Sequence, residues 1–388
     1  MRILDVDNGY SPTGGGIRTY HDRKLAFFAA REEHDYALVI PGVRDEVERV
    51  GRRTTVYRLR GVPVGAGYRA MLSRGALSRV LADFRPELVE VGSPYVLPHL
   101  VLPEIQRCGA ASVGFFHTDY PELFARQPLA RLSARVAARA EKLAVRHVGY
   151  TYRKFTAALG ASEHSLARLR AGGVEHVFLT PLGVDLTRFH PDRRDLALRA
   201  SLGVPEDVTL VLFLARFVPE KGLHHVLSAY PALRDPSRFR LAIGGHGPLA
   251  GRVDALVRDY PEVIRLPFEP DPLRVAALLA SADVVLSLSA GETFGLLTAE
   301  AVATGTTVVT RDRGAAPELA RLVGLEPMHG ERIEELVRAI RGAAPADARE
   351  RARRHAVIAA RHGWDRVFER FLEVYEEVRA LHRSEPCK

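Results

Sequence analysis

Short apolar runs rich in β-branched residues alternate with helical patterns along the whole chain, and this alternation limits the fold more than any other feature. The predicted strands are Arg2–Val6, Tyr36–Ile40, Thr55–Leu59, Leu88–Val91, Ser112–Phe116 and Thr156–Leu159 in the first half, and Leu210–Leu214, Leu241–Ile243, Val263–Leu266, Val284–Leu288 and Thr307–Thr310 in the second. The helical patterns between them include Ile17–Glu32, Leu123–Tyr152, Leu249–Tyr260, Leu273–Ala280 and Phe294–Ala303. Strands that alternate with helices form parallel sheets in α/β domains. Two such sets of similar size predict an α/β protein with two Rossmann-like domains that face a central cleft.

The boundary between these domains is expected at Thr180–Asp185, where Pro181 and Gly183 interrupt the pattern. A chain of 388 residues is also too long for one ordinary hydrophobic core. The charge balance changes at the same place. Residues 1–182 carry 26 Lys and Arg against 18 Asp and Glu, whereas residues 183–388 carry 29 of each. We therefore expect domains at residues 1–181 and 182–364.

The whole net charge of +8 lies in the first half. Either this half meets an acidic surface or substrate, or the excess is an Arg-rich composition without function. Hydrophobic residues make up 47% and charged residues 26%, as in soluble globular proteins. No apolar run is long enough to span a membrane, and the N-terminus enters a strand pattern directly instead of resembling a signal peptide. The two cysteines, Cys108 and Cys387, lie far apart, so we expect a cytoplasmic protein without disulfides.

The most informative motif is the run Ser289–Leu296, which leaves a predicted strand and enters a helix near Phe294. Free N–H groups and the positive end of the dipole make a helix start a phosphate site, and Gly295 lets the backbone approach a ligand closely. Glu292 precedes this helix and Glu300 lies about two turns into it. Because a carboxylate accepts hydrogen bonds from two hydroxyls, one glutamate can hold a ribose and the other a sugar. A solvated pair on a helix face is the alternative, but Glu292 lies in a Gly-rich turn.

Two cations, Arg216 and Lys221, follow the predicted strand Leu210–Leu214. Open α/β sheets bind ligands at the carboxyl ends of their strands. A guanidinium forks onto phosphate oxygens and an ammonium adds a compact charge, so the pair can stabilise a departing diphosphate. Taken alone, the two cations could equally be surface charges.

Two glycine-rich loops follow other predicted strands. Gly244–Pro248 opens a helix, but it lacks the complete G-x-G-x-x-G pattern and the acidic ribose partner of a dinucleotide dehydrogenase. Gly14, Gly15 and Gly16 lie between the first strand and its helix, where their N–H groups are open to an anion.

His117 stands at the end of the strand Ser112–Phe116, which favours a site role over that of a satisfied core histidine. Asp5-Val-Asp7 has the form of a metal-binding Asp-x-Asp motif, but a first strand that feeds a glycine loop is the wrong context for one.

Five motifs occur in a fixed order: Gly14-Gly15-Gly16, the strand-end His117, Arg216-x(4)-Lys221-Gly, Gly245-His-Gly247-Pro and Glu292-x(7)-Glu300. Together they resemble family 4 of the glycosyltransferases, which have the GT-B fold. The resemblance implies a catalytic set of His117, Arg216, Lys221 and Glu292, and a donor-binding set of Gly14, Gly15, Gly16, Gly245, Gly247, Phe294, Gly295, Leu296 and Glu300. It also implies that the final helix, within residues 365–388, joins the first domain, which would bind the acceptor.

The resemblance implies a retaining glycosyltransferase that moves a hexose from a UDP- or GDP-activated sugar to an acceptor hydroxyl and forms an α-glycosidic bond. No cofactor beyond the nucleotide-sugar co-substrate, no metal ion and no nucleic acid are expected. The acceptor would be a sugar, a lipid or glycolipid, or another small molecule. The alternatives are a nucleotide-sugar epimerase or hydrolase of the GT-B fold, and a nucleotide-sugar-binding protein without catalysis. Glu269 and Pro270 replace a usual Gly near the expected base pocket, so the motifs leave the base undecided.

The helical pattern Leu123–Tyr152 is strongly basic. Its apolar row is Leu129, Leu132, Val136, Ala140 and Leu143, and the cationic stripe beside it is Arg131, Arg135, Arg139, Lys142 and Arg146. One interpretation is an interfacial helix that binds anionic lipid at the inner face of the membrane. The other is a helix whose apolar row faces the core and whose cationic flank is solvated.

Overall fold

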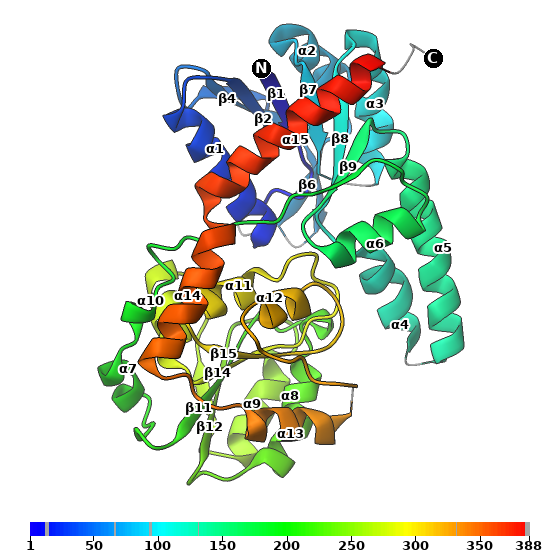
Figure 1. Ribbon diagram of the computed structural model, residues 1–388. Helices are drawn as coiled ribbons and strands as arrows, with labels where there is room; N and C mark the ends of the chain where they lie inside the picture. The colour runs from blue at the N-terminus through cyan, green and yellow to red at the C-terminus, as the bar shows by residue number, and fades with distance from the viewer. Residues whose placement is uncertain (12–14, 66, 93–94, 131, 331, 385–388) are drawn as a thin grey trace. The chain divides into compact units, whose positions relative to one another are not determined.

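The computed structural model describes all residues except 12–14, 66, 93–94, 131, 331 and 385–388, and it divides into two compact units (Figure 1). Unit 1 comprises residues 1–182 and 364–388, and unit 2 comprises residues 183–363. Each unit has its own parallel sheet covered by helices, as the α/β prediction requires. The assignment of the acceptor to one unit and the donor to the other stays a prediction.

The sheet of unit 1 has eight strands in the order β10-β9-β8-β7-β1-β2-β4-β3, all parallel except β3. The strands are β1 Arg2–Val6, β2 Asp35–Gly42, β3 Glu46–Arg49, β4 Thr54–Arg60, β7 Leu88–Val91, β8 Ala111–Phe116, β9 Ala157–Gly160 and β10 Val177–Leu179, and a separate hairpin joins β5 Val62–Gly65 to β6 Tyr68–Ala70. The strands β7, β8 and β9 are buried along their whole length, as expected for parallel strands that helices cover on both faces. The short strands β3, β5, β6 and β10 were not predicted, because none is a buried apolar run.

The helices of unit 1 are α1 Gly16–Ala30, α2 Arg74–Phe84, α3 Val96–Cys108, the π-helical η1 Pro121–Arg126, α4 Gln127–Ala130, α5 Ala134–Tyr152, α6 Glu163–Ala171 and α15 Trp364–Ser384. The last of these comes from the far end of the chain and lies across the unit (Figure 1). Nζ of the buried Lys24 donates to the Tyr375 hydroxyl at 2.6 Å and pairs with Asp5 at 2.7 Å. This buried polar network fastens α15 to α1 and β1, so the C-terminal helix is an integral part of unit 1.

The prediction of one continuous helix over Leu123–Tyr152 is wrong. The segment begins as the π-helix η1, continues as the single turn α4 and restarts at Ala134, where Ser133 caps α5. Helix α5 turns Ala137, Val145 and Val148 inward, whereas Leu132, Val136 and Leu143 are 80, 48 and 66% exposed. The interpretation of a core-facing apolar row is therefore wrong for these side chains. Arg131, from the predicted cationic stripe, lies outside the described residues.

Unit 2 has a five-stranded, wholly parallel sheet in the order β13-β12-β11-β14-β15. Its strands are β11 Thr209–Leu214, β12 Phe239–Gly244, β13 Ile264–Leu266, β14 Val284–Ser287 and β15 Thr307–Thr310. Its helices are η2 Pro191–Arg193, α7 Leu196–Ser201, η3 Pro219–Lys221, α8 Leu223–Leu233, α9 Ala250–Asp259, α10 Pro272–Ser281, α11 Leu296–Ala303, α12 Ala316–Leu322, α13 Ile333–Gly342 and α14 Ala348–His362. A continuous apolar core joins this sheet to α8, α9 and α13.

Candidate functional site

The strand order of unit 2 reverses between β11 and β14. The chain runs outward from β11 through β12 to β13 on one side, and from β14 to β15 on the other. Loops that leave neighbouring strands in opposite directions open a crevice at the carboxyl edge, which is where open α/β sheets bind ligands. Lys221 follows β11 and Glu292 follows β14, so both candidate residues lie at this reversal.

Lys221 and Glu292 form an ion pair across the reversal. Nζ of Lys221 donates to Oε1 of Glu292 at 2.7 Å, and both side chains are mostly buried. Gly222 makes this approach possible. It has a φ of +75°, and a Cβ there would lie 2.8 Å from the carbonyl oxygen of Leu288 in the loop after β14. Oε2 of Glu292 is buried and makes no hydrogen bond with any described residue, so this oxygen remains able to accept one.

The glycine loop after β12 packs directly on the loop after β11. Gly245 and Gly247 have φ values of +133° and +146°, and a Cβ on either would lie within 2.8 Å of a carbonyl oxygen, that of Ala215 or Phe217. The Phe217 N–H donates to the His246 carbonyl at 2.7 Å and joins the two loops. They hold Arg216 with its guanidinium mostly exposed, 3.9 Å from Glu220. An exposed guanidinium at the edge of the crevice can reach a phosphate.

Helix α11 begins one turn after Glu292 and supplies the predicted anion-binding helix start. Its N-cap is Gly295, with a φ of +89° and no side-chain cap, so the first N–H groups are not used by a side chain. The carbonyl of Glu292 accepts from the N–H of Ala315 at 3.1 Å, which ties the preceding loop to α12. The helix starts at Leu296 instead of near Phe294, because Gly295 before it has a left-handed backbone conformation that an α-helix cannot contain. These features make the start of α11 a suitable site for phosphate oxygens.

Glu300 lies in the second turn of α11 and is mostly enclosed. Burial raises the pKa of its carboxyl to about 8, and the negative charges of Glu292 and Asp185 act in the same direction. Arg188 opposes this shift. Glu300 is therefore largely protonated at neutral pH, and a neutral carboxyl both donates and accepts hydrogen bonds, as a pair of vicinal hydroxyls does. The sequence reasoning did not single out Arg188 and Asp185, whose only signal was their place beside the predicted linker.

His117 lies in unit 1, at the end of β8. Its ring packs on Phe115 with centroids 3.9 Å apart, and its Nε2 lies 3.9 Å from Oδ2 of Asp7. Burial lowers the pKa of His117 to about 4, although Asp7 acts against the shift. The imidazole is therefore neutral at physiological pH and can accept or donate a hydrogen bond to a sugar hydroxyl.

Asp7 is held in a niche at the end of β1. It accepts from Nε2 of His21 at 2.8 Å and from the N–H of Gly9 at 2.6 Å, and a Cβ on Gly92 would lie 2.1 Å from its carboxylate. Ligand atoms of Asp7, His21 and His117 lie within 4.8 Å of one another, so these three residues could hold a metal ion. Sequence reasoning dismissed Asp7 and did not consider His21. The expectation of a metal-independent reaction stays a prediction.

The early glycines stand where the chain enters α1. Gly15 is the N-cap of this helix and Gly16 its first residue, whereas Gly14 lies outside the described residues. A Cβ on Gly15 would meet no atom of the described residues within 4 Å, so its backbone is open toward that part of the structure. The predicted residues thus divide between the two units. Unit 2 holds Arg216, Lys221, Glu292, Glu300, Gly245, Gly247 and the start of α11, and unit 1 holds His117, Gly15 and Gly16.

Two protein-family models match the chain. Residues 14–188 match the model described as Glycosyltransferase Family 4, and residues 195–341 match the model described as Glycosyl transferases group 1. The second match falls within unit 2, whereas the first covers unit 1 from residue 14 and continues to residue 188 of unit 2.

The chain is also similar to characterised proteins. It is 34% identical over 328 residues, covering 82% of this chain and 81% of the relative, to a GDP-mannose-dependent alpha-(1-6)-phosphatidylinositol dimannoside mannosyltransferase of Mycobacterium tuberculosis. It is 25% identical to a GDP-mannose-dependent alpha-mannosyltransferase of Corynebacterium glutamicum, over 82% of this chain and 74% of the relative. Among solved structures, sucrose-phosphate synthase from Thermosynechococcus elongatus superposes with a TM-score of 0.76 at 18% identity, covering 98% of this chain and 100% of the other.

Proposed function

The chain belongs to family 4 of the glycosyltransferases, and from this premise we propose that it transfers mannose from GDP-mannose to a glycolipid built on phosphatidylinositol. The family resemblance drawn from the motifs is confirmed, and with it the GT-B fold and a retaining, nucleotide-sugar-dependent hexosyl transfer. The observation that carries the choice of donor and acceptor is the relative at 34% identity, whose name contains both.

The donor half of the reaction follows from the geometry of unit 2. We propose that Arg216, Lys221 and the N–H groups at the start of α11 bind the diphosphate, whose growing negative charge they stabilise as it leaves. Lys221 already faces Glu292 at 2.7 Å, so the cation on the phosphate and the carboxylate on the transferred sugar lie side by side. Glu300, protonated by burial, suits the ribose hydroxyls two turns along the same helix.

The proton and the stereochemistry follow from the same arrangement. We propose that the acceptor hydroxyl attacks from the face of the leaving diphosphate, and that a phosphate oxygen takes its proton. This route retains the configuration without a side-chain nucleophile. His117, with its pKa lowered to about 4 by burial, is neutral and serves to orient the sugar instead of carrying charge.

Nucleotide release tests this function. GDP-mannose and UDP-sugars are offered with and without phosphatidylinositol mannosides in vesicles. We expect GDP release from GDP-mannose to rise when the acceptor lipid is present and a mannosylated lipid to form. Release that does not depend on an acceptor would favour the hydrolase, and a changed sugar nucleotide would favour the epimerase.

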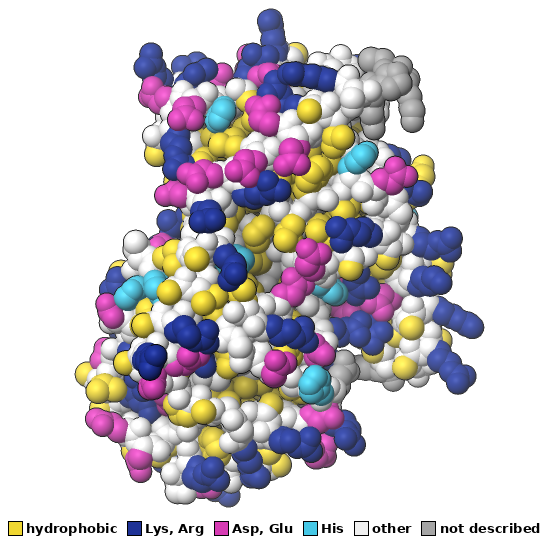
Figure 2. Space-filling model, in the orientation of Figure 1, with side chains coloured by type: hydrophobic (Ala, Val, Ile, Leu, Met, Phe, Trp, Pro, Cys, Tyr) yellow, Lys and Arg dark blue, Asp and Glu magenta, His cyan; other side chains and the backbone are white. Residues whose placement is uncertain are grey.

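The acceptor proposal includes attachment to an anionic membrane. None of the helices in the described part of the chain is long and apolar enough to cross a bilayer. Helix α5 instead exposes Val136, Leu143 and Tyr150 along one stripe, and Leu132 just before the helix is exposed as well. Exposed Arg135, Arg139, Lys142 and Arg146 flank that stripe, and Figure 2 shows cationic side chains gathered over this edge of unit 1. An apolar stripe beside cations is the pattern of a helix that lies in the lipid interface.

Co-sedimentation with anionic vesicles at low salt tests this attachment. We expect the R139Q/R146Q variant to lose most of its binding, because each cation near an anionic surface contributes about 1 kcal/mol. The R349Q/R361Q variant removes two exposed charges from α14 and is the matched control, expected to bind as the wild type does. Equal binding by both variants, or no binding by the wild type, would contradict attachment through α5.

A further inference from the structure

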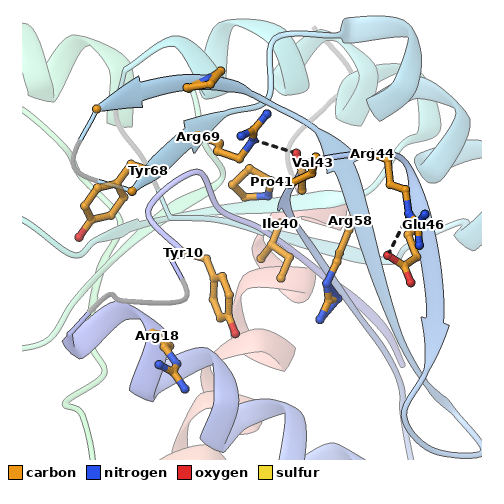
Figure 3. A pocket seen from close by; sticks show the side chains of 14 residues that line it. Tyr10, Arg18, Ile40, Pro41, Val43, Arg44, Glu46, Arg58, Tyr68 and Arg69 are labelled. Atoms are coloured by element: carbon orange, nitrogen blue, oxygen red, sulfur yellow. Dashed lines mark hydrogen bonds and ion pairs between the residues drawn. The ribbon is translucent and has the colours of Figure 1, made fainter. Parts of the chain in front are cut away.

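Unit 1 contains a cavity of about 840 Å³ that the donor chemistry does not use (Figure 3). It is lined by residues at the ends of β2 and β4, by residues of β5 and β6, and by Tyr10, which follows β1. A volume of this size suits a sugar-sized ligand with its substituents. Its lining comprises Tyr10, Arg18, Ile40, Pro41, Gly42, Val43, Arg44, Glu46, Arg58, Pro63, Gly65, Gly67, Tyr68 and Arg69.

Arg58 is placed in the cavity by the register of three strands. It pairs with Ile40 of β2 on one side and with Glu46 of β3 on the other, and all three line the cavity. Its Nη2 lies 3.2 Å from Glu48, whereas its Nη1 is buried and makes no hydrogen bond with any described residue. A buried donor that lacks an acceptor is costly, so this atom is suited to a ligand oxygen.

Three further guanidinium groups line the same cavity, on different elements (Figure 3). Arg44 lies 3.8 Å from Glu46, and Nε of Arg69 donates to the carbonyls of Gly42 and Gly61. With four arginines and one glutamate, the charged side chains of the lining sum to +3. A concave site with this excess attracts an anion, and guanidinium groups match the geometry of phosphate oxygens.

The cavity also carries groups that suit a neutral polyol. Asp22 holds the first of them in place, since it accepts from the Tyr10 hydroxyl at 3.1 Å, and Asp22 also pairs with Arg18 at 3.2 Å. Tyr68 of β6 brings a second phenol to the lining (Figure 3). Tyrosine hydroxyls donate to and accept from sugar or cyclitol hydroxyls, which guanidinium groups can only donate to.

We infer that this cavity binds the acceptor, and that the acceptor is a phosphate ester of a polyol whose phosphate is held by Arg58 with Arg18, Arg44 or Arg69. This inference deepens the proposed function and rests on it for the identity of the acceptor. The cavity itself stands on the arginines and on Nη1 of Arg58. It places a specificity-determining anion site in unit 1, the half of the chain that holds the whole charge excess.

Acceptor kinetics test the site. The KM for phosphatidylinositol mannoside in vesicles and the KM for GDP-mannose are measured for the wild type, R58Q, R58K and R52Q. Loss of a charge-assisted hydrogen bond predicts a rise of roughly tenfold to a hundredfold in the acceptor KM of R58Q, with the donor KM unchanged. R58K retains the positive charge but not the two-pronged guanidinium geometry, so its acceptor KM should lie between those of the wild type and R58Q. Arg52 is an exposed arginine of the same unit that does not line the cavity, and R52Q should behave as the wild type.

Equal acceptor KM values for R58Q and R52Q, or parallel rises in both KM values, would overturn the inference. A wild type that moves no mannose to the lipid overturns the proposed function alone, and calorimetry then tests the cavity directly. Inositol 1-phosphate should bind the wild type, more weakly R58Q, and myo-inositol should bind neither tightly.

The same experiments distinguish a free phosphomonoester from the phosphodiester of a lipid headgroup as the ligand of this site. Binding of inositol 1-phosphate that competes with the vesicle substrate assigns the site to phosphomonoesters as well as lipid. If the R58Q substitution lowers turnover of the vesicle substrate but inositol 1-phosphate does not bind, the site recognises the phosphodiester of the lipid headgroup. Absence of both effects overturns the site.

Discussion

The two units hold their candidate binding groups in different ways. In unit 2, Arg216 and Lys221 lie in one short run after β11, and Glu292 and Glu300 in another after β14. In unit 1, the arginines of the cavity come from α1, the β2–β3 connection, β4 and β6. A group that directly follows a strand is placed by the strand itself, whereas a group on a sheet face is placed by register with strands elsewhere in the chain. The first kind of site can be read from a motif and the second cannot.

The largest expected effect is on unit 2. Replacing Lys221 with Ala removes the cation that faces Glu292 at 2.7 Å and leaves that carboxylate without its partner. We expect the rate of GDP release to fall by about a hundredfold to a thousandfold, the range for losing one preorganised electrostatic donor. K154A, which removes an exposed lysine of unit 1, is the control and should retain its rate. A near-normal rate for K221A would mean that the motif-based site is not the donor site.

Two glycine-to-alanine substitutions test whether a glycine of unit 2 is required by close packing or only adds backbone flexibility. Gly245 has a φ of +133° and its Cβ would lie 2.0 Å from the Ala215 carbonyl oxygen, so G245A should destabilise the protein by about 2 kcal/mol or more. Gly251 lies in α9 with open space around it, so G251A should stabilise by roughly 0.5–1 kcal/mol. Chemical denaturation measures both. A G245A variant as stable as the wild type would show that the two loops do not interlock.

Glu300 gives a pH-dependent effect of smaller size. Its folded pKa of about 8 lies above the ordinary 4.5, so the folded state binds the proton more tightly than the unfolded state. Folding stability therefore falls as the pH rises from about 4.5 to 8. The E300Q variant cannot ionise, so its Tm relative to the wild type should rise across this range and level off above it, by roughly 2–4 °C for each kcal/mol of pH-dependent stability. A constant difference between pH 5 and pH 9 would contradict the raised pKa.

The smallest effect is expected from metal removal. The Asp7 carboxylate already accepts hydrogen bonds from His21 and Gly9, and His117 is predicted to orient the sugar. Dialysis against EDTA should leave mannosyl transfer unchanged within experimental error. A loss of more than half of the rate, restored by zinc or manganese, would turn this cluster of unit 1 into a metal site and remove one difference between the units.

Most of the fold of unit 2 could be predicted because its strands are buried on both faces and read as continuous apolar runs. Its candidate residues stand next to those runs, so the start of α11 and the place of Lys221 followed from the chain alone. The ion pair of Lys221 with Glu292 could not be predicted. It depends on β11 and β14 being neighbours, which is a property of the strand order.

Less of unit 1 could be predicted. The strands β3 and β5 are short and exposed, and β6 is a three-residue strand of intermediate burial. The break before α5 had local signals in Pro128 and the capping Ser133, but the helical pattern on both sides outweighed them. The basic stripe of α5 could be recognised in the sequence from the helical spacing of its cations. Its orientation could not, because a helix with apolar and cationic rows side by side can turn either row outward, and only the packing of Ala137, Val145 and Val148 decides between them.

By itself, the sequence determined the α/β class, the family and the residues expected to bind the diphosphate. Strand patterns and loop motifs are local features, so they can be recognised without knowing which elements pack together. The tertiary structure alone decided which of these side chains touch, the burial that raises the pKa of Glu300 and lowers that of His117, and the gathering of Arg18, Arg44, Arg58 and Arg69 around one cavity. Contacts, burial and enclosed charge depend on elements far apart in the chain, and only packing brings those elements together.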